Sequence, residues 1–236
     1  MGTKSFEDMK SKIPIDHDAV KNAYVRCIVV PIIQSIPQNL RGSHVPAAEK
    51  DWEIVVFQDP TANAFALPGG KIGVHTGILP VAKTDAQLAA VLGHEVGHVL
   101  ARHGNERVSE GIAAQIGMAG LAAMLSGEDS SPTKLNLMTA ALGAGTQYGI
   151  LLPHSRTQES EADLIGLDLM ARAGFDPHQS VDLWKNMSAG GKAPPEFLST
   201  HPSGTTRIDN LQAHMKDAMA KYTQAQAAGR KPHCSL

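Results

Sequence analysis

The apolar residues of the chain recur at the spacing of amphipathic helices in most segments. This pattern predicts helices over residues 18–36, 84–103, 157–173 and 205–222, and a further helix that begins near Pro177. Pro31 is expected to kink or break the first helix, because a proline inside a helix removes a backbone donor. Gly174, with Pro177 beyond it, is the expected end of the third helix.

A different pattern, rich in β-branched residues, occupies residues 52–57 and predicts a strand. Asn63–Leu67 and Lys71–Thr76 follow, and we interpret them as a β-hairpin whose turn glycines supply positive φ values. The sequence shows neither an internal repeat nor a linker, so we expect an α+β fold in a single domain, 1–236. Within it we expect an N-terminal helix and loop at 1–50, a core at 52–222 and a frayed tail at 223–236.

Charge and cysteine content exclude several classes of protein. The 21 Lys and Arg residues against 23 Asp and Glu residues leave a net charge of −2, so we expect no nucleic-acid partner. The two cysteines, Cys27 and Cys234, are too few for a disulfide scaffold or for a cysteine zinc site. Whether they pair with each other stays open.

Two long uncharged stretches, 111–125 and 135–153, raise the question of a membrane. The first is shorter than the roughly 20 residues of a spanning helix, and polar residues and glycines dilute the second. Their small residues fit two interpretations, which are tight packing in the core and a flap over a cleft that touches a membrane surface. The first residues lack the apolar segment of a secretory signal, so we expect a chain from which a leader is absent.

The segment H-E-V-G-H at 94–98 lies within the helix predicted over 84–103. Residues four apart share a helical face, so His94 and His98 can reach one metal ion. Glu95 then lies beside that metal, where it can take a proton from water. Two surface histidines on an ordinary helix are the alternative, but the apolar surroundings and the helix cap favour a catalytic metal site.

A catalytic zinc site requires a third protein ligand. His103 is the nearest candidate, but it follows His94 by nine residues, whereas the long metzincin pattern requires ten. A helix that continues through residue 103 would also turn this side chain elsewhere. We therefore expect His103 to lie on a polar face or in a loop.

A better source of the third ligand is the segment S-R-T-Q-E-S-E-A-D at 155–163. Glu159 and Asp163 are four apart on a predicted helix, so their side chains can point the same way. A carboxylate that binds a metal often accompanies a second carboxylate that orients a ligand histidine. A solvated acidic face is the alternative, and the preceding H-E-x-x-H motif makes it the weaker one.

Together the two segments carry a resemblance. H-E-V-G-H, followed about sixty residues later by S-R-x-x-E-x-E-A-D, resembles metallopeptidase family forty-eight. Two more segments match, N-A-F-A-L-P-G-G at 63–70 and His201-Pro202 followed by Arg207, so that the resemblance covers about residues 52–211. The membrane-spanning helices of its HtpX and CAAX prenyl protease branches are missing, so the sequence looks more similar to the periplasmic BepA and LoiP types.

The resemblance implies a mainly helical zincin domain of the gluzincin type, with a small sheet beside the H-E-x-x-H helix and one Zn²⁺ per chain. It implies that the zinc ligands are His94, His98 and Glu159. It also implies that Glu95 is the catalytic base and that Asp163 lies behind the ligands. The implied substrate-binding strand consists of Asn63, Ala64, Phe65, Ala66 and Leu67.

His201 and Arg207 are implied to lie near the metal, where they stabilise the oxyanion of the tetrahedral intermediate or cap the zinc at rest. A loop histidine and a helix-capping arginine are the alternative for this pair.

The combined interpretation is a zinc-dependent endopeptidase with a glutamate base. By the resemblance, its expected task is quality control of misfolded envelope proteins, with unfolded polypeptides as partners. The expected location is the periplasm or the periplasmic side of a membrane, in preference to the cytoplasm. Two alternatives stay open: a latent zinc-bound chaperone or adaptor with little turnover, and a metal hydrolase that acts on non-peptide substrates.

Overall fold

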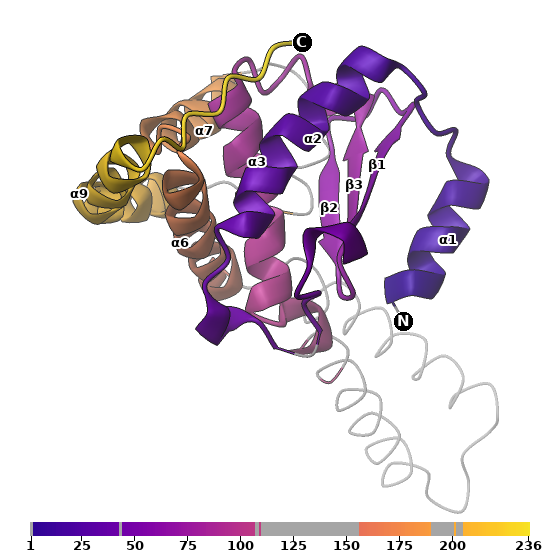
Figure 1. Ribbon diagram of the computed structural model, residues 1–236, viewed down its shortest axis with the longest axis horizontal. Coiled ribbons are helices and arrows are strands. Elements are labelled where there is room, and N and C mark those ends of the chain that lie inside the picture. The colour runs from indigo at the N-terminus through magenta and orange to yellow at the C-terminus, as the bar shows by residue number, and fades with distance from the viewer. Residues whose placement is uncertain (1, 43, 107–108, 110–155, 190–200, 202–204) are drawn as a thin grey trace, which may run out of the picture.

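The computed structural model describes residues 2–42, 44–106, 109, 156–189, 201 and 205–236 (Figure 1). Its named helices are α1 (Gly2–Lys12), α2 (Ala19–Gln34), α3 (Asp85–Leu100), α6 (Arg156–Ala173), α7 (His178–Ala189) and α9 (Thr205–Ala227). Its strands are β1 (Glu53–Phe57), β2 (Ala64–Leu67) and β3 (Lys71–His75), and three single-turn helices lie at Gln38–Leu40, Glu49–Asp51 and Thr76–Ile78. The mainly helical α+β fold expected from the sequence is thus confirmed.

The three strands form one sheet in the order β1-β3-β2, with β3 parallel to β1 and antiparallel to β2. The hairpin β2–β3 turns at Gly69 and Gly70, whose φ angles of 87° and 72° lie in the left-handed region that glycine adopts without strain. A short antiparallel bridge between Ile15 and Phe57 covers the outer edge of β1. The outer edge of β2 faces α3.

Both faces of the sheet are covered by helices, with α1 on one side and α2 and α3 on the other (Figure 1). Under α1, the ring of Phe6 meets those of Phe57 and Phe65 at centroid distances of 6.1 and 6.2 Å. The opposite face contributes Val56, Ala64, Ile72 and Val74 to the main core. Because successive strand residues point to opposite faces, the apolar run over β1 fills both cores.

Helix α3 is the central element of the fold, since every residue from Ala86 to Leu100 is buried. Thr84 caps its first turn by accepting a hydrogen bond from the backbone N–H of Gln87. The sheet and α2 lie on one side of α3, and α6, α7 and α9 lie beyond it on the other (Figure 1). Polar residues on this helix are therefore enclosed from several directions.

Helices α3 and α6 cross so closely that their backbones are in contact. A Cβ atom at Gly166 of α6 would lie 2.6 Å from the backbone nitrogen of His94, and one at Gly97 of α3 would lie 2.8 Å from the carbonyl oxygen of Ala162. Side chains larger than hydrogen at Gly97 and Gly166 would therefore separate the two helices. This close crossing brings the carboxylates of α6 against the histidines of α3.

Several expected boundaries agree with the structure and others differ. Helix α6 ends at Ala173, and Gly174 follows with a φ of 95°, as its sequence pattern predicts. Helix α2 continues through Pro31, which lies near the end of the helix, and ends three residues later. Helix α1, which precedes the helix expected over 18–36, was not expected. The uncharged stretches 111–125 and 135–153 lie outside the described residues.

The C-terminal segment also differs from the expected frayed tail at 223–236. Helix α9 extends to Ala227, five residues beyond its expected end. The segment that follows is attached to α2 by a disulfide between Cys27 and Cys234, and the backbone N–H of Cys234 donates to the Asp85 carboxylate. The cysteine pair that the sequence left open is therefore formed.

Among the described helices, none has both the length and the apolar character that crossing a bilayer requires.

Candidate metal centre

Two histidines of α3 turn the same ring nitrogen toward one point. His94 and His98 lie one turn apart, and their Nε2 atoms are 3.0 Å from each other. Both side chains are buried. Since a histidine nitrogen that faces a metal must present its lone pair, two converging Nε2 atoms suit a shared cation.

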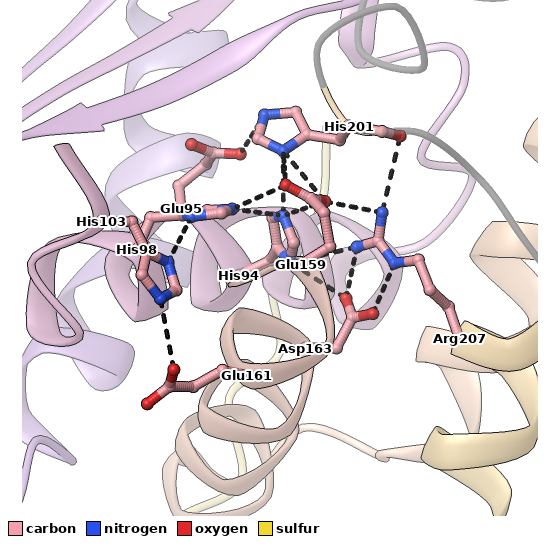
Figure 2. A network of polar contacts seen from close by, with 9 residues as sticks. All are labelled: His94, Glu95, His98, His103, Glu159, Glu161, Asp163, His201 and Arg207. Atoms are coloured by element: carbon pink, nitrogen blue, oxygen red, sulfur yellow. Dashed lines mark hydrogen bonds and ion pairs between the residues drawn. The ribbon is translucent and has the colours of Figure 1, made fainter. Parts of the chain in front are cut away.

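A carboxylate from α6 and a third imidazole complete this group (Figure 2). Glu159 places Oε2 3.5 Å from His94 Nε2 and Oε1 3.4 Å from His98 Nε2. His201 places Nδ1 3.0 Å from Glu159 Oε1 and 3.2 Å from His94 Nε2. One ligand atom from each of the four residues lies within 4.8 Å of the others. Imidazole nitrogen and carboxylate oxygen are donors that zinc accepts, so this set fits a metal ion.

The charges in this cluster are strongly coupled. Burial lowers the pKa of His94, but hydrogen bonds with Asp163 and Glu159 outweigh it and raise that pKa to about 9. Burial raises the pKa of Glu159, but hydrogen bonds from His201, His94 and His98 bring it far below the usual range. Glu159 is therefore an anion at neutral pH, which is the form that binds a cation.

Behind His94, an ion pair connects α6 to α9. Asp163 Oδ1 lies 3.0 Å from His94 Nδ1. The guanidinium of Arg207 donates to both oxygens of Asp163 at 2.6 Å and reaches Glu159 Oε2 at 2.8 Å. Its planar group lies 3.8 Å from the ring centroid of Trp184, a cation–π contact.

This pair fixes the protonation of Asp163. Burial raises the pKa of Asp163, and the hydrogen bonds from Arg207 and His94 more than reverse that effect. An ionised Asp163 accepts the Nδ1 proton of His94, so the proton that His94 would give up to a metal is the one on Nε2, and the lone pair would face the cluster.

Glu95 lies at the edge of the same cluster. Its carboxylate is buried, with Oε1 3.4 Å from His201 Nε2, and it accepts a hydrogen bond from the backbone N–H of Ala66. Burial raises the pKa of Glu95, against the lowering effect of His201 and His94. A carboxylate with a raised pKa binds a proton more readily near neutral pH.

Strand β2, next to Glu95, pairs with β3 along one edge, and no strand among the described residues pairs with its other edge. The backbone N–H of His75 donates to the carbonyl of Asn63, so Asn63 faces β3. Backbone groups alternate in direction along a strand, so those of Ala64 and Ala66 point away from β3. The hydrogen bond from Ala66 to Glu95 agrees with this direction.

The structure brings the predicted site residues together around one point. His94, Glu95 and His98 come from α3, Glu159 and Asp163 from α6, Arg207 from α9, and His201 from a separate segment. The predicted strand 63–67 corresponds to β2, which begins one residue later, at Ala64. Its residue Ala66 contacts the cluster by a backbone hydrogen bond to Glu95.

Two further residues of the site were missed by sequence reasoning. His103 was expected on a polar face or in a loop, but its side chain is buried and its Nδ1 lies 2.8 Å from His98 Nδ1. The reason is that α3 ends at Leu100, so His103 does not continue the helix. Trp184, which stacks on Arg207, follows no motif that could have found it.

Histidines on successive turns of one helix, opposed by a glutamate from a second helix, define a zincin-like metal site. Comparison with known proteins agrees: residues 20–215 match the model of peptidase family M48. The chain belongs to this family.

The chain is also similar to individual proteins, and each match covers most of the chain but only part of the relative. The chain is 43% identical over 176 residues to the mitochondrial metalloendopeptidase OMA1 of Schizosaccharomyces pombe, which covers 72% of the chain and 48% of that protein. It is 32% identical over 179 residues to the human mitochondrial metalloendopeptidase OMA1, covering 72% of the chain and 33% of that protein. It is 25% identical over 213 residues to the β-barrel assembly-enhancing protease of Escherichia coli K12, covering 88% of the chain and 42% of that protein.

The chain thus spans half or less of the length of these relatives. The expected periplasmic branch is not singled out, since identity to the OMA1 proteins is higher than to the bacterial protease.

Proposed function

We propose that this protein is a zinc-dependent endopeptidase. The observation that carries the proposal is the buried convergence of His94, His98 and Glu159 beside the carboxylate of Glu95. When bound there, a zinc ion supplies the Lewis acidity that activates water and polarises a scissile carbonyl. The three residues would hold it, and His94 would be oriented by Asp163.

Glu95 is the proposed general base. Its buried carboxylate, with a raised pKa, takes the proton of the attacking water and later delivers it to the leaving amine. The N–H of Ala66 and the ring of His201 hold that carboxylate in place. No other carboxylate among the described residues of the cluster lies on α3 next to the histidines.

The substrate is proposed to bind as an added strand along β2. Ala64 and Ala66 direct their backbone groups outward, and the opposite edge of the sheet is already covered by residues 14–16. Strand addition recognises backbone, so it accepts many sequences, as a protease for unfolded chains requires. The predicted role of Asn63, Ala64, Phe65, Ala66 and Leu67 stays a proposal on these grounds.

For Arg207 we propose a different role from the stabilisation of an oxyanion that the resemblance implies. Its Nε, Nη1 and Nη2 atoms all contact the carboxylates of Asp163 and Glu159. This supports a role in holding both carboxylates ionised and oriented, in preference to direct contact with an oxyanion.

The proposed task is the degradation of misfolded polypeptides in an oxidising, extracytoplasmic compartment. The disulfide between Cys27 and Cys234 supports such a compartment, because thiols stay reduced in most cytosols. Quality control of envelope proteins and peripheral contact with a membrane are part of this proposal.

Removal of the metal tests the activity directly. We expect the zinc-loaded protein to cleave unfolded casein, to lose this activity after treatment with a chelator, and to regain it when zinc is restored. A protein that binds zinc and leaves casein intact would instead be the latent chaperone or adaptor. Cleavage of ester but not peptide substrates would indicate the non-peptide hydrolase.

His201 is proposed as a fourth ligand at rest that also assists turnover, because its Nδ1 lies within reach of the same point as the other donors. In His201→Ala we expect one zinc per chain, faster removal of that zinc by a chelator, and turnover lower by roughly 10²-fold. His178→Ala, at an exposed histidine of α7, is the control that should leave both rates unchanged. An unchanged chelation rate with reduced turnover would limit His201 to the transition state.

A further inference from the structure

The two histidines of α3 are supported in different ways behind the metal centre. His94 Nδ1 meets the Asp163 carboxylate, whereas His98 Nδ1 meets a second imidazole, that of His103. We propose that His103, oriented by Glu161, is a positioning residue that fixes the tautomer and the ring orientation of His98. This inference rests on the proposed metal site and concerns two residues to which the proposed function assigns no role.

The geometry favours a directed contact over chance proximity. His103 is 1% exposed, and its Nδ1 lies 2.8 Å from His98 Nδ1. On the far side of the ring, His103 Nε2 lies 3.4 Å from the carboxylate Oε2 of Glu161 on α6 (Figure 2). The three groups form a row from the half-exposed surface of α6 to the buried metal centre.

Only one placement of protons gives a donor and an acceptor at each contact between His98, His103 and Glu161 while His98 keeps a lone pair for the metal. His98 must keep the Nε2 lone pair for a metal, so its Nδ1 carries a proton. That proton is donated to the lone pair on His103 Nδ1, which requires the proton of His103 to be on Nε2. There it points to the Glu161 carboxylate, which accepts. Glu161 thereby selects the tautomer of His103, and His103 selects that of His98.

The backbone between the two histidines is also specialised for this contact. Helix α3 ends at Leu100, and Arg102 follows with a φ of 61°, the one non-glycine residue with positive φ among those described. Such a conformation is unfavourable for a residue with a Cβ. It turns the chain back so that the next residue, His103, lies under His98 instead of continuing the helix.

The test compares two substitutions that separate hydrogen bonding from packing. His103→Phe keeps a ring but removes the acceptor, whereas His103→Asn is smaller and places an amide oxygen where Nδ1 was. We expect zinc affinity, measured by competition with a chelator, to fall by about 10- to 100-fold in His103→Phe. In His103→Asn we expect recovery to within about 3-fold of the wild type, since the acceptor is restored.

A role in packing alone predicts the reverse order, because phenylalanine would fill the buried site better than asparagine. That order, or equal affinity in all three proteins, would overturn the proposal. The visible absorption of bound Co²⁺ gives a second measurement, and we expect it to change in His103→Phe and to return in His103→Asn. His214→Asn, at an exposed histidine of α9, is the matched control and should leave affinity unchanged.

The role of Glu161 is tested by a double-mutant cycle. Its contact is half-exposed, so Glu161→Ala should lower zinc affinity by only about 2- to 5-fold. When combined with His103→Phe, it should add no further loss, because Glu161 acts through His103. Fully additive losses would overturn that part of the proposal. Failure of the wild-type protein to bind zinc or Co²⁺ would instead overturn the proposed function.

Discussion

Glu95→Gln is expected to keep one zinc per chain and to lose at least about 10²-fold in the turnover of unfolded casein. The amide has nearly the same shape as the carboxylate, so the hydrogen-bonding surroundings of residue 95 persist. It cannot take a proton from water, however, and it cannot return one to the leaving amine. Metal content and initial cleavage rates, measured on the same preparation, separate these two effects.

Glu7→Gln is the matched control for this substitution, since Glu7 is an exposed carboxylate of α1 that pairs with Lys10. It should leave both metal content and turnover unchanged. Near-normal cleavage by Glu95→Gln would show that another group accepts the proton, and the assignment of Glu95 would then be abandoned.

Glu159→Ala is expected to abolish zinc binding at stoichiometric concentrations and, with it, all casein cleavage. The substitution removes one of three proposed protein ligands and the anion that offsets the charge of the cation. It also leaves Arg207, which contacts Glu159 Oε2 at 2.8 Å, as a buried positive charge close to the metal position. Zinc content after dialysis is the direct measurement.

The control variant lies on the same helix. Asp168 pairs with Arg172 of α6 and Lys221 of α9 and is not among the residues that could hold the metal, so Asp168→Asn should retain full zinc content. Glu161→Ala should also retain one zinc at saturation, although with weaker affinity. Equal zinc content in Glu159→Ala and Asp168→Asn would place the third ligand elsewhere.

The site was predictable from the sequence wherever it depends on the period of a helix. His94 and His98 are four apart, as are Glu159 and Asp163, so each pair shares a face whatever surrounds the helix. The resemblance to a known family then joined the two pairs. The hairpin turn followed from a short-range signal as well, the glycines Gly69 and Gly70, whereas the parallel pairing of β3 with β1 had no such signal.

The parts that were not predictable depend on contacts between distant segments. His103 was misplaced because α3 ends at Leu100 and Arg102 then adopts a left-handed conformation, neither of which the sequence pattern indicates. Trp184 is important only because α7 and α9 bring it over Arg207. Helix α1 is short and has few apolar residues, and it is placed by Phe6 packing on the sheet.

The disulfide between Cys27 and Cys234 makes most of the chain a closed covalent ring, because 207 residues separate the two sulfur-bearing positions. The proposed ligands His98 and Glu159 both belong to this ring. A single peptide bond broken between them would open the ring without creating two molecules, and the donors would stay tethered around the same point. A nicked chain would then migrate as one species on a gel without reductant and as two species with it.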